Sequence, residues 1–407
     1  MTVSLTRRRW ALFALFFVPG LSLASWVTRT PAIRDLLHAS TAQMGLVLFG
    51  LSVGSMLGIL CSGALVAKFG GRPVIAAGIA GVALSMPVIG LGAGAGAAWV
   101  VAAGLFVFGL GLGAADVAMN VEGADVERAG RRPFLPALHG CFSLGTVVGA
   151  LAGIGATATG FPVVWHLVLT GALGAGVFGA AIRSVLPGTG RVPLLRADGS
   201  AGTAATPPIW KDARLVLIGV IVLAMALTEG TANDWLPLIM VDGHGFGEAW
   251  GSAIFAVFAA SMTLGRFAGG PVIARLGRAL VLGISAGFAL LGLVVVAFVD
   301  SQFTAVAAVV LWGLGASLGF PVALSAAGDS GPNPAVRVSL VATIGYIAFL
   351  VGPPLLGFVG EQVGLRHALV IPMIVVLVAM FLSPAVKNRP VVERQGLADE
   401  PVAPTRL

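Results

Sequence analysis

Charged residues, cysteines and lysines are all scarce in this chain, and each shortage excludes a class of protein. Only 10% of the residues are charged, against about 25% in an ordinary soluble domain, so the chain cannot cover itself with a water-soluble surface. The two cysteines, Cys61 and Cys141, lie inside apolar runs, which predicts small buried side chains rather than a disulfide framework or metal site. The lysines (Lys68, Lys211 and Lys387) lack the context of a phosphate-binding loop, which disfavours ATP-driven pumping.

The composition also argues against an enzyme and against a nucleic-acid-binding protein. No nucleophile–base pair or metal-ligand cluster stands out in the sequence, and we expect no cofactor. The net charge of +7 is not concentrated in a basic patch interleaved with exposed polar residues. A membrane sensor that does not transport is a further alternative, although the sequence carries no obvious soluble sensory domain.

Apolar residues dominate what is present. They make up 57% of the chain, the mean hydropathy is +1.00, and runs of roughly 20 residues, long enough to cross about 30 Å of hydrocarbon, recur throughout. The sequence therefore predicts an all-α integral membrane protein with twelve transmembrane helices. The first six are expected at 10–32, 42–66, 73–91, 99–123, 135–157 and 163–185, and the second six at 214–239, 249–273, 279–299, 303–326, 337–359 and 366–386.

The spans fall into two sets of six. We predict an N-terminal bundle over 1–186, a Gly-, Pro- and Ala-rich cytoplasmic linker over 187–213, a C-terminal bundle over 214–387 and a polar cytoplasmic tail over 388–407. The first segment, "TRRRWALFALFFVPG", could also be read as an export signal. We interpret it as a transmembrane helix with a basic flank, because spans of the same kind follow it.

The basic residues predict the orientation in the membrane. Of the 24 Lys and Arg residues, 20 lie at the N-terminus, in or beside the loops after even-numbered spans, or in the tail. By the positive-inside rule both termini are cytoplasmic, which also explains the net charge without nucleic acid.

An internal repeat relates the two halves. A shift of 207 positions places "LGILCSGALVAKFGGRPV", Leu57 to Val74, over "LGRFAGGPVIARLGRALV", Leu264 to Val281. A second match pairs Phe108–Gly113 with Trp312–Ser317. Both matches join corresponding spans, as expected of parallel repeats about an axis along the membrane normal.

The repeated loop resembles a motif of the major facilitator superfamily. Within "GALVAKFGGRP" the glycines and basic residues match the pattern G-x-L-x-D-R-x-G-x-R, while Ala67, like Ala274 in the second copy, stands where the family usually has aspartate. The resemblance implies a gate in which the loops brace the cytoplasmic face. The residues assigned to it are Gly63, Lys68, Gly70, Arg72, Gly270, Arg275, Gly277 and Arg278.

Two further segments suggest a branch of that superfamily. "DVAMNVEGADVER" (Asp116–Arg128) and "EGTANDWLPLIM" (Glu229–Met240) are similar to the branch of MosC- and YbjJ-type membrane proteins, which is distantly similar to fucose permeases. The resemblance implies two pseudo-symmetric six-helix bundles around a central cavity and a secondary transporter, often proton-coupled. We expect a monomer in the bacterial inner membrane.

Ionisable residues inside spans are costly and are therefore functional candidates. Asp116 lies deep in the fourth span, where hydrocarbon penalises its charged form, so it could carry a proton; it could also be paired structurally with another span. Glu229 in the seventh span is the second candidate for proton coupling. His139 could join a relay with Asp116 or simply be hydrogen-bonded at the interface.

Other residues are candidates for a substrate cavity. Glu229, Asn233 and Asp234 form a cluster that we place towards the outer side of the seventh span, where they could bind a polar solute or line a hydrated mouth. Arg29 could bind an anionic group or pair with Asp234, and Arg266 could snorkel or form a buried ion pair. The assigned cavity residues are Asn120, Asn233, Trp26, Arg29, Asp234, Arg266, Phe320 and Tyr346.

The function expected from these residues is transport of a small polar solute and protons. A sugar, polyol or amino-cyclitol is the expected cargo, and proton-antiport efflux of drugs or metabolites is the alternative. Intramembrane acids serve either, so the sequence leaves the direction open.

Overall fold

The computed structural model describes residues 4–130, 134–191, 209–331 and 334–387, and within them every regular element is a helix. Twelve helices are long and apolar enough to span a membrane, as the sequence predicts. Most of the predicted linker (192–208) and the predicted tail (388–407) lie outside the described residues.

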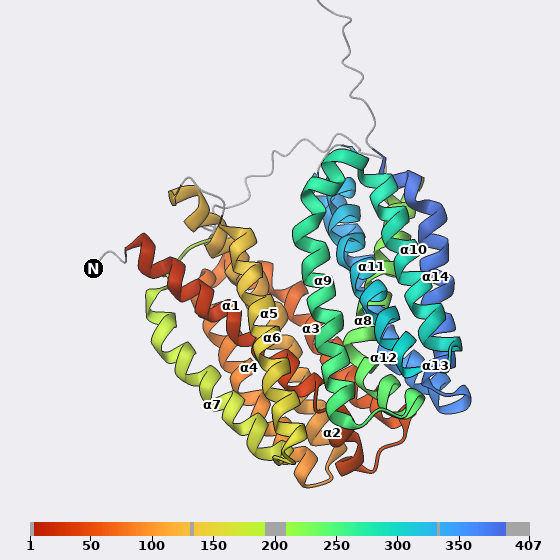
Figure 1. The fold of residues 1–407 in the computed structure, drawn as a ribbon. Helices are drawn as coiled ribbons and strands as arrows, with labels where there is room; N and C mark the ends of the chain where they lie inside the picture. Colours follow the sequence, from red (N-terminus) through yellow and green to blue (C-terminus); the bar gives the residue numbers. More distant parts are fainter. Residues whose placement is uncertain (1–3, 131–133, 192–208, 332–333, 388–407) are drawn as a thin grey trace, which may run out of the picture.

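The helices form two bundles that stand side by side (Figure 1). The first bundle contains α1 (Leu5–Val27), α2 (Thr30–Leu37), α3 (Thr41–Phe69), α4 (Gly71–Gly94), α5 (Ala98–Gly130), α6 (Leu135–Ala158) and α7 (Val163–Ala181), which ends in a 3₁₀ turn, Ile182–Ser184. The second begins with a 3₁₀ turn, Ile209–Lys211. It continues through α8 (Ala213–Leu238) with a π-helical turn (Ile239–Gly243), α9 (Glu248–Leu276), α10 (Arg278–Phe298), α11 (Gln302–Gly328), α12 (Pro334–Val363), α13 (Leu365–Ala368), α14 (Val370–Leu382) and a last 3₁₀ turn (Ser383–Val386).

The two faces of the molecule can be named by what lies on them. The start of α1, the ends of the segment between the bundles and the end of α14 lie on one side, which we call the terminal face (Figure 1). The short helix α2 lies on the opposite side, which we call the distal face.

The first span differs from its predicted bounds, 10–32. Helix α1 begins earlier, because the Ser4 hydroxyl accepts the Arg7 amide and caps it. It ends at Val27, and Pro31, in the first turn of α2, starts a separate helix there. The position of Cys61 also differs: it is exposed on the surface of α3 rather than buried.

The repeat is visible in the backbone. Gly70, between α3 and α4, has φ 87° and ψ 165°, and Gly277, between α9 and α10, has φ 79° and ψ 158°. Both conformations require glycine, and the two residues are 207 positions apart, as the sequence match predicts. Gly63 and Gly270, the other glycines assigned to the motif, have no such structural requirement. A Cβ at either position would meet nothing within 4 Å, so neither glycine allows two helices to approach closely.

The two bundles are joined at the distal face. The Ser252 hydroxyl donates to the Thr28 carbonyl at 2.7 Å, and the Ala42 amide donates to Glu361 at 3.1 Å. Arg34 pairs with Asp242 across the same boundary. Burial disfavours the charge of Arg34, but the hydrogen bonds to Asp242 and Asp35 outweigh it and raise the pKa of Arg34.

The backbones of α3 and α12 also touch near this face, because a Cβ at Gly357 would lie 2.9 Å from the Gly45 Cα. Among the described residues, every hydrogen bond or ion pair between the bundles lies at the distal face. At the terminal face the bundles diverge (Figure 1).

Candidate functional site

A cavity of about 220 Å³ lies between the bundles on the distal side of the membrane region, and we call it the distal cavity. Trp26 from α1 and Ser52 and Ser55 from α3 line it on one side. Asn233 and Asp234 from α8 and Tyr346 from α12 line it on the other. Four of the predicted cavity residues, Trp26, Asn233, Asp234 and Tyr346, are therefore brought together although they come from three helices.

Asp234 and the Trp26 indole N–H are among the polar groups of the distal cavity that have no partner in the described part of the chain. Asp234 is 8% exposed and makes no hydrogen bond or ion pair there, and the buried Trp26 indole N–H also lacks an acceptor. Burying a polar group without a hydrogen bond costs free energy, and burying a charge costs more. A hydroxyl group of a solute could donate to Asp234 or accept from the Trp26 indole N–H, and an amine could donate to Asp234.

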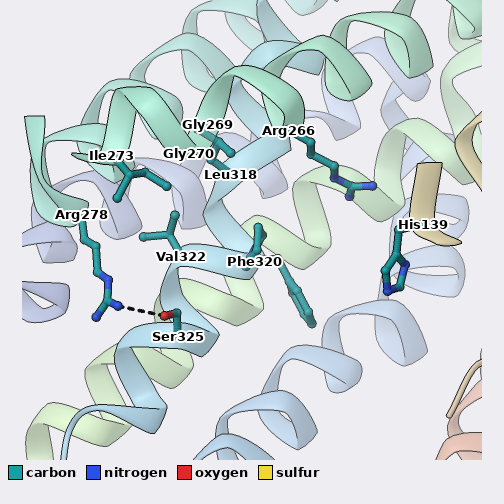
Figure 2. A pocket seen from close by; sticks show the side chains of 11 residues that line it. His139, Arg266, Gly269, Gly270, Ile273, Arg278, Leu318, Phe320, Val322 and Ser325 are labelled. Atoms are coloured by element: carbon teal, nitrogen blue, oxygen red, sulfur yellow. Dashed lines mark hydrogen bonds between the residues drawn. The ribbon is translucent and has the colours of Figure 1, made fainter. Parts of the chain in front are cut away.

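A second cavity, of about 590 Å³, lies nearer the terminal face, and we call it the terminal cavity. His139 from α6 lines it from the first bundle, and Arg266, Arg278, Phe320 and Ser325 line it from the second. Figure 2 shows Arg266 extending from α9 towards the side of the cavity where His139 lies. Phe320 and Arg266 are thus separated from the four predicted cavity residues that line the distal cavity, and Asn120 and Arg29 line neither cavity.

Arg266 does not simply snorkel to the membrane surface. Its Nη2 lies 3.0 Å from Oε1 of Glu229, so the pair joins α9 to α8. Glu229 is near the middle of the span Ala213–Gly243 and not towards its outer end. Although Glu229 and Asp234 are close in sequence, Asp234 lines the distal cavity, whereas Glu229 pairs with Arg266, which lines the terminal cavity.

Asp116, Asn120 and His139 form a chain of contacts. The Asn120 side-chain amide donates to the Asp116 carbonyl at 2.9 Å, and His139 Nε2 lies 3.2 Å from Asn120 Oδ1. The Asp116 carboxylate is close enough to His139 and to Tyr346 to interact electrostatically with both. Since Tyr346 lines the distal cavity and His139 the terminal cavity, Asp116 lies between the two.

Arg29 lies apart from these groups. Its guanidinium donates to Thr157 Oγ1 at 2.8 Å and to the Phe161 carbonyl at 2.7 Å, so it joins α1 to the end of α6 and does not pair with Asp234. Burial lowers the pKa of Arg29. In this arrangement Arg29 therefore does not form the pair with Asp234 that the sequence offered as one alternative.

The residues assigned to the gate do not join the two bundles in the described structure. Lys68 and Arg275 are exposed, with the Lys68 ammonium 5.1 Å from the Phe69 ring. Arg278 pairs with Asp329 at 2.6 Å and donates to Ser325, so it connects α10 to α11 within one bundle. The α3–α4 turn lies in the first bundle and the α9–α10 turn in the second. Because the bundles diverge at this face, the two turns do not brace it in this arrangement.

A buried ion pair near the terminal face was missed by sequence reasoning. Arg8 lies 2.8 Å from Glu122, whose side chain is fully buried, and 2.7 Å from Asp125. The Leu186 amide also donates to Glu122, at 3.3 Å. Arg8 belongs to a basic run that reads as a topology signal. Only Glu122, an acid in the same apolar helix as Asp116, could have suggested an intramembrane partner.

Comparison with known proteins agrees with the arrangement of twelve spans described above. A family model described as Major Facilitator Superfamily matches residues 11–338. An uncharacterized MFS-type transporter of Yersinia pestis is 32% identical over 87% of this chain and 89% of its own length. The membrane protein MosC of Rhizobium meliloti is 27% identical over 87% of this chain and 84% of its own length.

Solved structures share the fold at lower identity. A variant of the nucleoside transporter NupG has a TM-score of 0.75 and 15% identity, covering 93% of this chain and 99% of that one. The fucose:proton symporter FucP of E. coli has a TM-score of 0.59 and 16% identity, covering 94% and 98%. Both likenesses concern the arrangement of the helices.

Proposed function

Because this chain belongs to the Major Facilitator Superfamily, we propose that it is a secondary active transporter that moves a small polar organic solute by alternating access. The observation that carries the proposal is the unpaired, buried Asp234 in a cavity to which both bundles contribute. A sugar, polyol or amino-cyclitol offers hydroxyl groups that can donate to Asp234 and accept from the Trp26 indole N–H, and the amine of an amino-cyclitol can donate to Asp234.

The size of the distal cavity supports a small solute. Its volume of about 220 Å³ is below the roughly 300–1,000 Å³ typical of pockets for drug-sized ligands. Efflux of large drugs therefore fits less well than transport of a compact metabolite, although the apolar Met56 and Phe349 in its lining would suit an efflux substrate. The cavity itself suits either direction of transport.

Alternating access is supported by the asymmetry between the two faces. The bundles are joined at the distal face and diverge at the terminal face, so the described arrangement corresponds to one of the two states that the cycle requires. We propose that the terminal face is cytoplasmic, that the membrane is the bacterial inner membrane and that one chain suffices. In the other state, Lys68, Arg72, Arg275 and Arg278 would brace the closed cytoplasmic face.

Proton coupling is proposed at Asp116 and at Glu229. Asp116 lies between the two cavities, and Glu229 pairs with Arg266 at the terminal cavity. Protonation of Glu229 would weaken its attraction to Arg266, whereas protonation of Asp116 would remove a charge beside Tyr346. The fucose:proton symporter among the structures with this fold supports coupling of this kind only by analogy.

Purified protein can test the proposal with a ligand screen followed by flux. Sugars, inositols, amino sugars and cationic drugs are screened for a rise in the unfolding temperature, and any hit is then measured for uptake into proteoliposomes. Asp234→Asn should abolish the thermal shift and reduce uptake at least about tenfold, because the site loses its charge. Asp300→Asn, at an exposed distal carboxylate, is the control and should behave like wild type.

The screen also distinguishes the alternatives. Stabilisation by cationic drugs alone would favour efflux, and binding without any flux would favour a sensor. Wild-type ligand binding in Asp234→Asn would refute the assignment of the distal cavity as the solute site.

A further inference from the structure

An apolar groove runs along the outer surface of the first bundle. Helices α3 and α4 diverge from the turn at Gly70, and both pack along α5, which forms the floor of the groove. Its volume is about 350 Å³, and it is deep because small residues such as Gly78, Gly81 and Ala114 line it. Leu65 (38% exposed) and Leu110 (36%) lie along it on the outer surface, so it opens towards the hydrocarbon of the membrane.

A basic pocket continues the groove at the terminal face. This pocket, of about 630 Å³, contains Arg72 and Arg191 and shares Phe69 and Pro73 with the groove. The apolar groove therefore leads directly into a pocket that contains two arginines, and we call the two together the lipid groove.

The positive charge of this pocket is not compensated within the described part of the chain. There, none of Arg72, Arg191 and Lys68 forms an ion pair, and the Lys68 ammonium lies 5.1 Å from the ring of Phe69. Arg72 also lies in the first turn of α4, which contains no acidic residue, so the positive end of the helix adds to the field.

At the corresponding turn of the second bundle, between α9 and α10, an aspartate balances the charge of the arginine. Arg278, in the first turn of α10, pairs with Asp329 at 2.6 Å. The counterpart of Asp329, 204 positions earlier as in the second repeat match, is Asp125. Asp125 is engaged by Arg8 at 2.7 Å, so it does not serve Arg72.

We propose that the lipid groove binds an anionic phospholipid of the leaflet at the terminal face. Arg72 and Arg191 would hold the phosphate, and one acyl chain would lie over Gly81 and Ala114 in the groove. A lipid is favoured over a free anion because the basic pocket is continuous with an apolar surface that water would not fill. The site lies outside both transport cavities and does not depend on what the protein transports.

Native mass spectrometry of the full chain in detergent tests the site with phosphatidylglycerol and phosphatidylcholine of identical acyl chains. We expect phosphatidylglycerol to be retained about tenfold or more preferentially, and Arg72→Gln with Arg191→Gln to abolish this preference. Lys211→Gln with Arg275→Gln removes the same charge from exposed positions on the same face and should preserve it.

The acyl-chain half of the site is tested separately by Gly81→Val. A Cβ at Gly81 would meet its nearest neighbours at 3.7 Å, so the fold accommodates it while the groove becomes shallower. This variant should retain phosphatidylglycerol several-fold less well although both arginines are present. It also keeps the proposal testable if the arginine variant does not fold.

Three outcomes would overturn the proposal. Equal retention of the two lipids would show that charge is not recognised, and undiminished retention in the arginine variant would place the lipid elsewhere. Displacement of phosphatidylglycerol by millimolar glycerol phosphate would show that the pocket binds a free anion and that the groove contributes nothing.

Discussion

At the scale of single residues, Asp116 lies between the two cavities. One helical turn before it, Leu112 lines the distal cavity, and one turn after it, Asn120 contacts His139 of the terminal cavity. A carboxylate in this position can exchange protons with one cavity while it affects the electrostatics of the other. This supports the proposed coupling role of Asp116 more strongly than its depth in the membrane alone.

The substitution Asp116→Asn mimics the protonated residue at nearly constant size. If Asp116 carries the coupled proton, the variant should still exchange labelled solute across the membrane, because exchange requires no net proton release. Accumulation driven by a proton gradient should fall at least about tenfold. Both rates are measured in the same proteoliposomes. Gradient-driven accumulation at the wild-type rate and with wild-type pH dependence would transfer the role to Glu229.

At the scale of elements, α8 is anchored at its start by one aspartate. The Asp212 carboxylate accepts the amides of Arg214 and Leu215, which caps the helix, and pairs with Arg337 of α12 at 2.8 Å. Burial disfavours the charge of Asp212, but the hydrogen bonds from Arg337 and the two amides outweigh this and lower the pKa of Asp212. The carboxylate therefore stabilises the second bundle in its ionised form.

Asp212→Asn keeps a side-chain oxygen that can cap α8 but loses the charge that pairs with Arg337, so it should lower the unfolding temperature at pH 7 by about 1 to 4 °C. The pKa is lower in the folded than in the unfolded chain, so the contribution is complete above the unfolded value, near pH 4. It is lost as the pH falls through the lower folded value. The difference between variant and wild type should therefore shrink on acidification. A difference independent of pH, measured by tryptophan fluorescence, would contradict this account.

Helix ends illustrate what local sequence can predict. The Ser40 and Gln43 side chains form a reciprocal cap at the start of α3, and this spacing can be read from the sequence. The break after α1 could be placed less well, because Pro31 can start a helix or lie within a membrane span. Tertiary contacts at the distal face decide in favour of a separate α2, whose Arg34 pairs with Asp242.

At the scale of the whole molecule, closure of the distal face depends on two glycines. Gly45 and Gly357 allow α3 and α12 to touch across the bundle boundary, and a side chain at Gly357 would clash with the Gly45 backbone. This contact exists only when the distal face is closed, so a larger residue should favour the opposite state of the transport cycle.

Gly357→Val should expose the distal cavity to the distal side of the membrane. In a protein without natural cysteines, Ser52→Cys reports this through its labelling by a membrane-impermeant maleimide. A penalty of about 1.4 kcal/mol on closure would raise labelling about tenfold. Gly176→Val, where a Cβ meets nothing within 4 Å, is the matched control and should leave labelling unchanged. Unchanged labelling in Gly357→Val would mean that the glycine contact does not limit closure.

The membrane environment, the twelve spans and the relation between the halves could all be predicted before any tertiary contact was known. These follow from hydropathy, glycine positions and repeated motifs, which are properties of consecutive residues, and the α3–α4 and α9–α10 turns confirm the repeat. Which polar residues contact one another could not be predicted in this way. The helices are apolar on nearly all sides, so periodicity does not reveal which side faces a cavity. Asp234 therefore lines the distal cavity while Glu229 pairs with Arg266. Arg29 contacts Thr157 of α6, and Arg8 pairs with Glu122. In each case, helix rotation and packing between segments distant in sequence determine the partner.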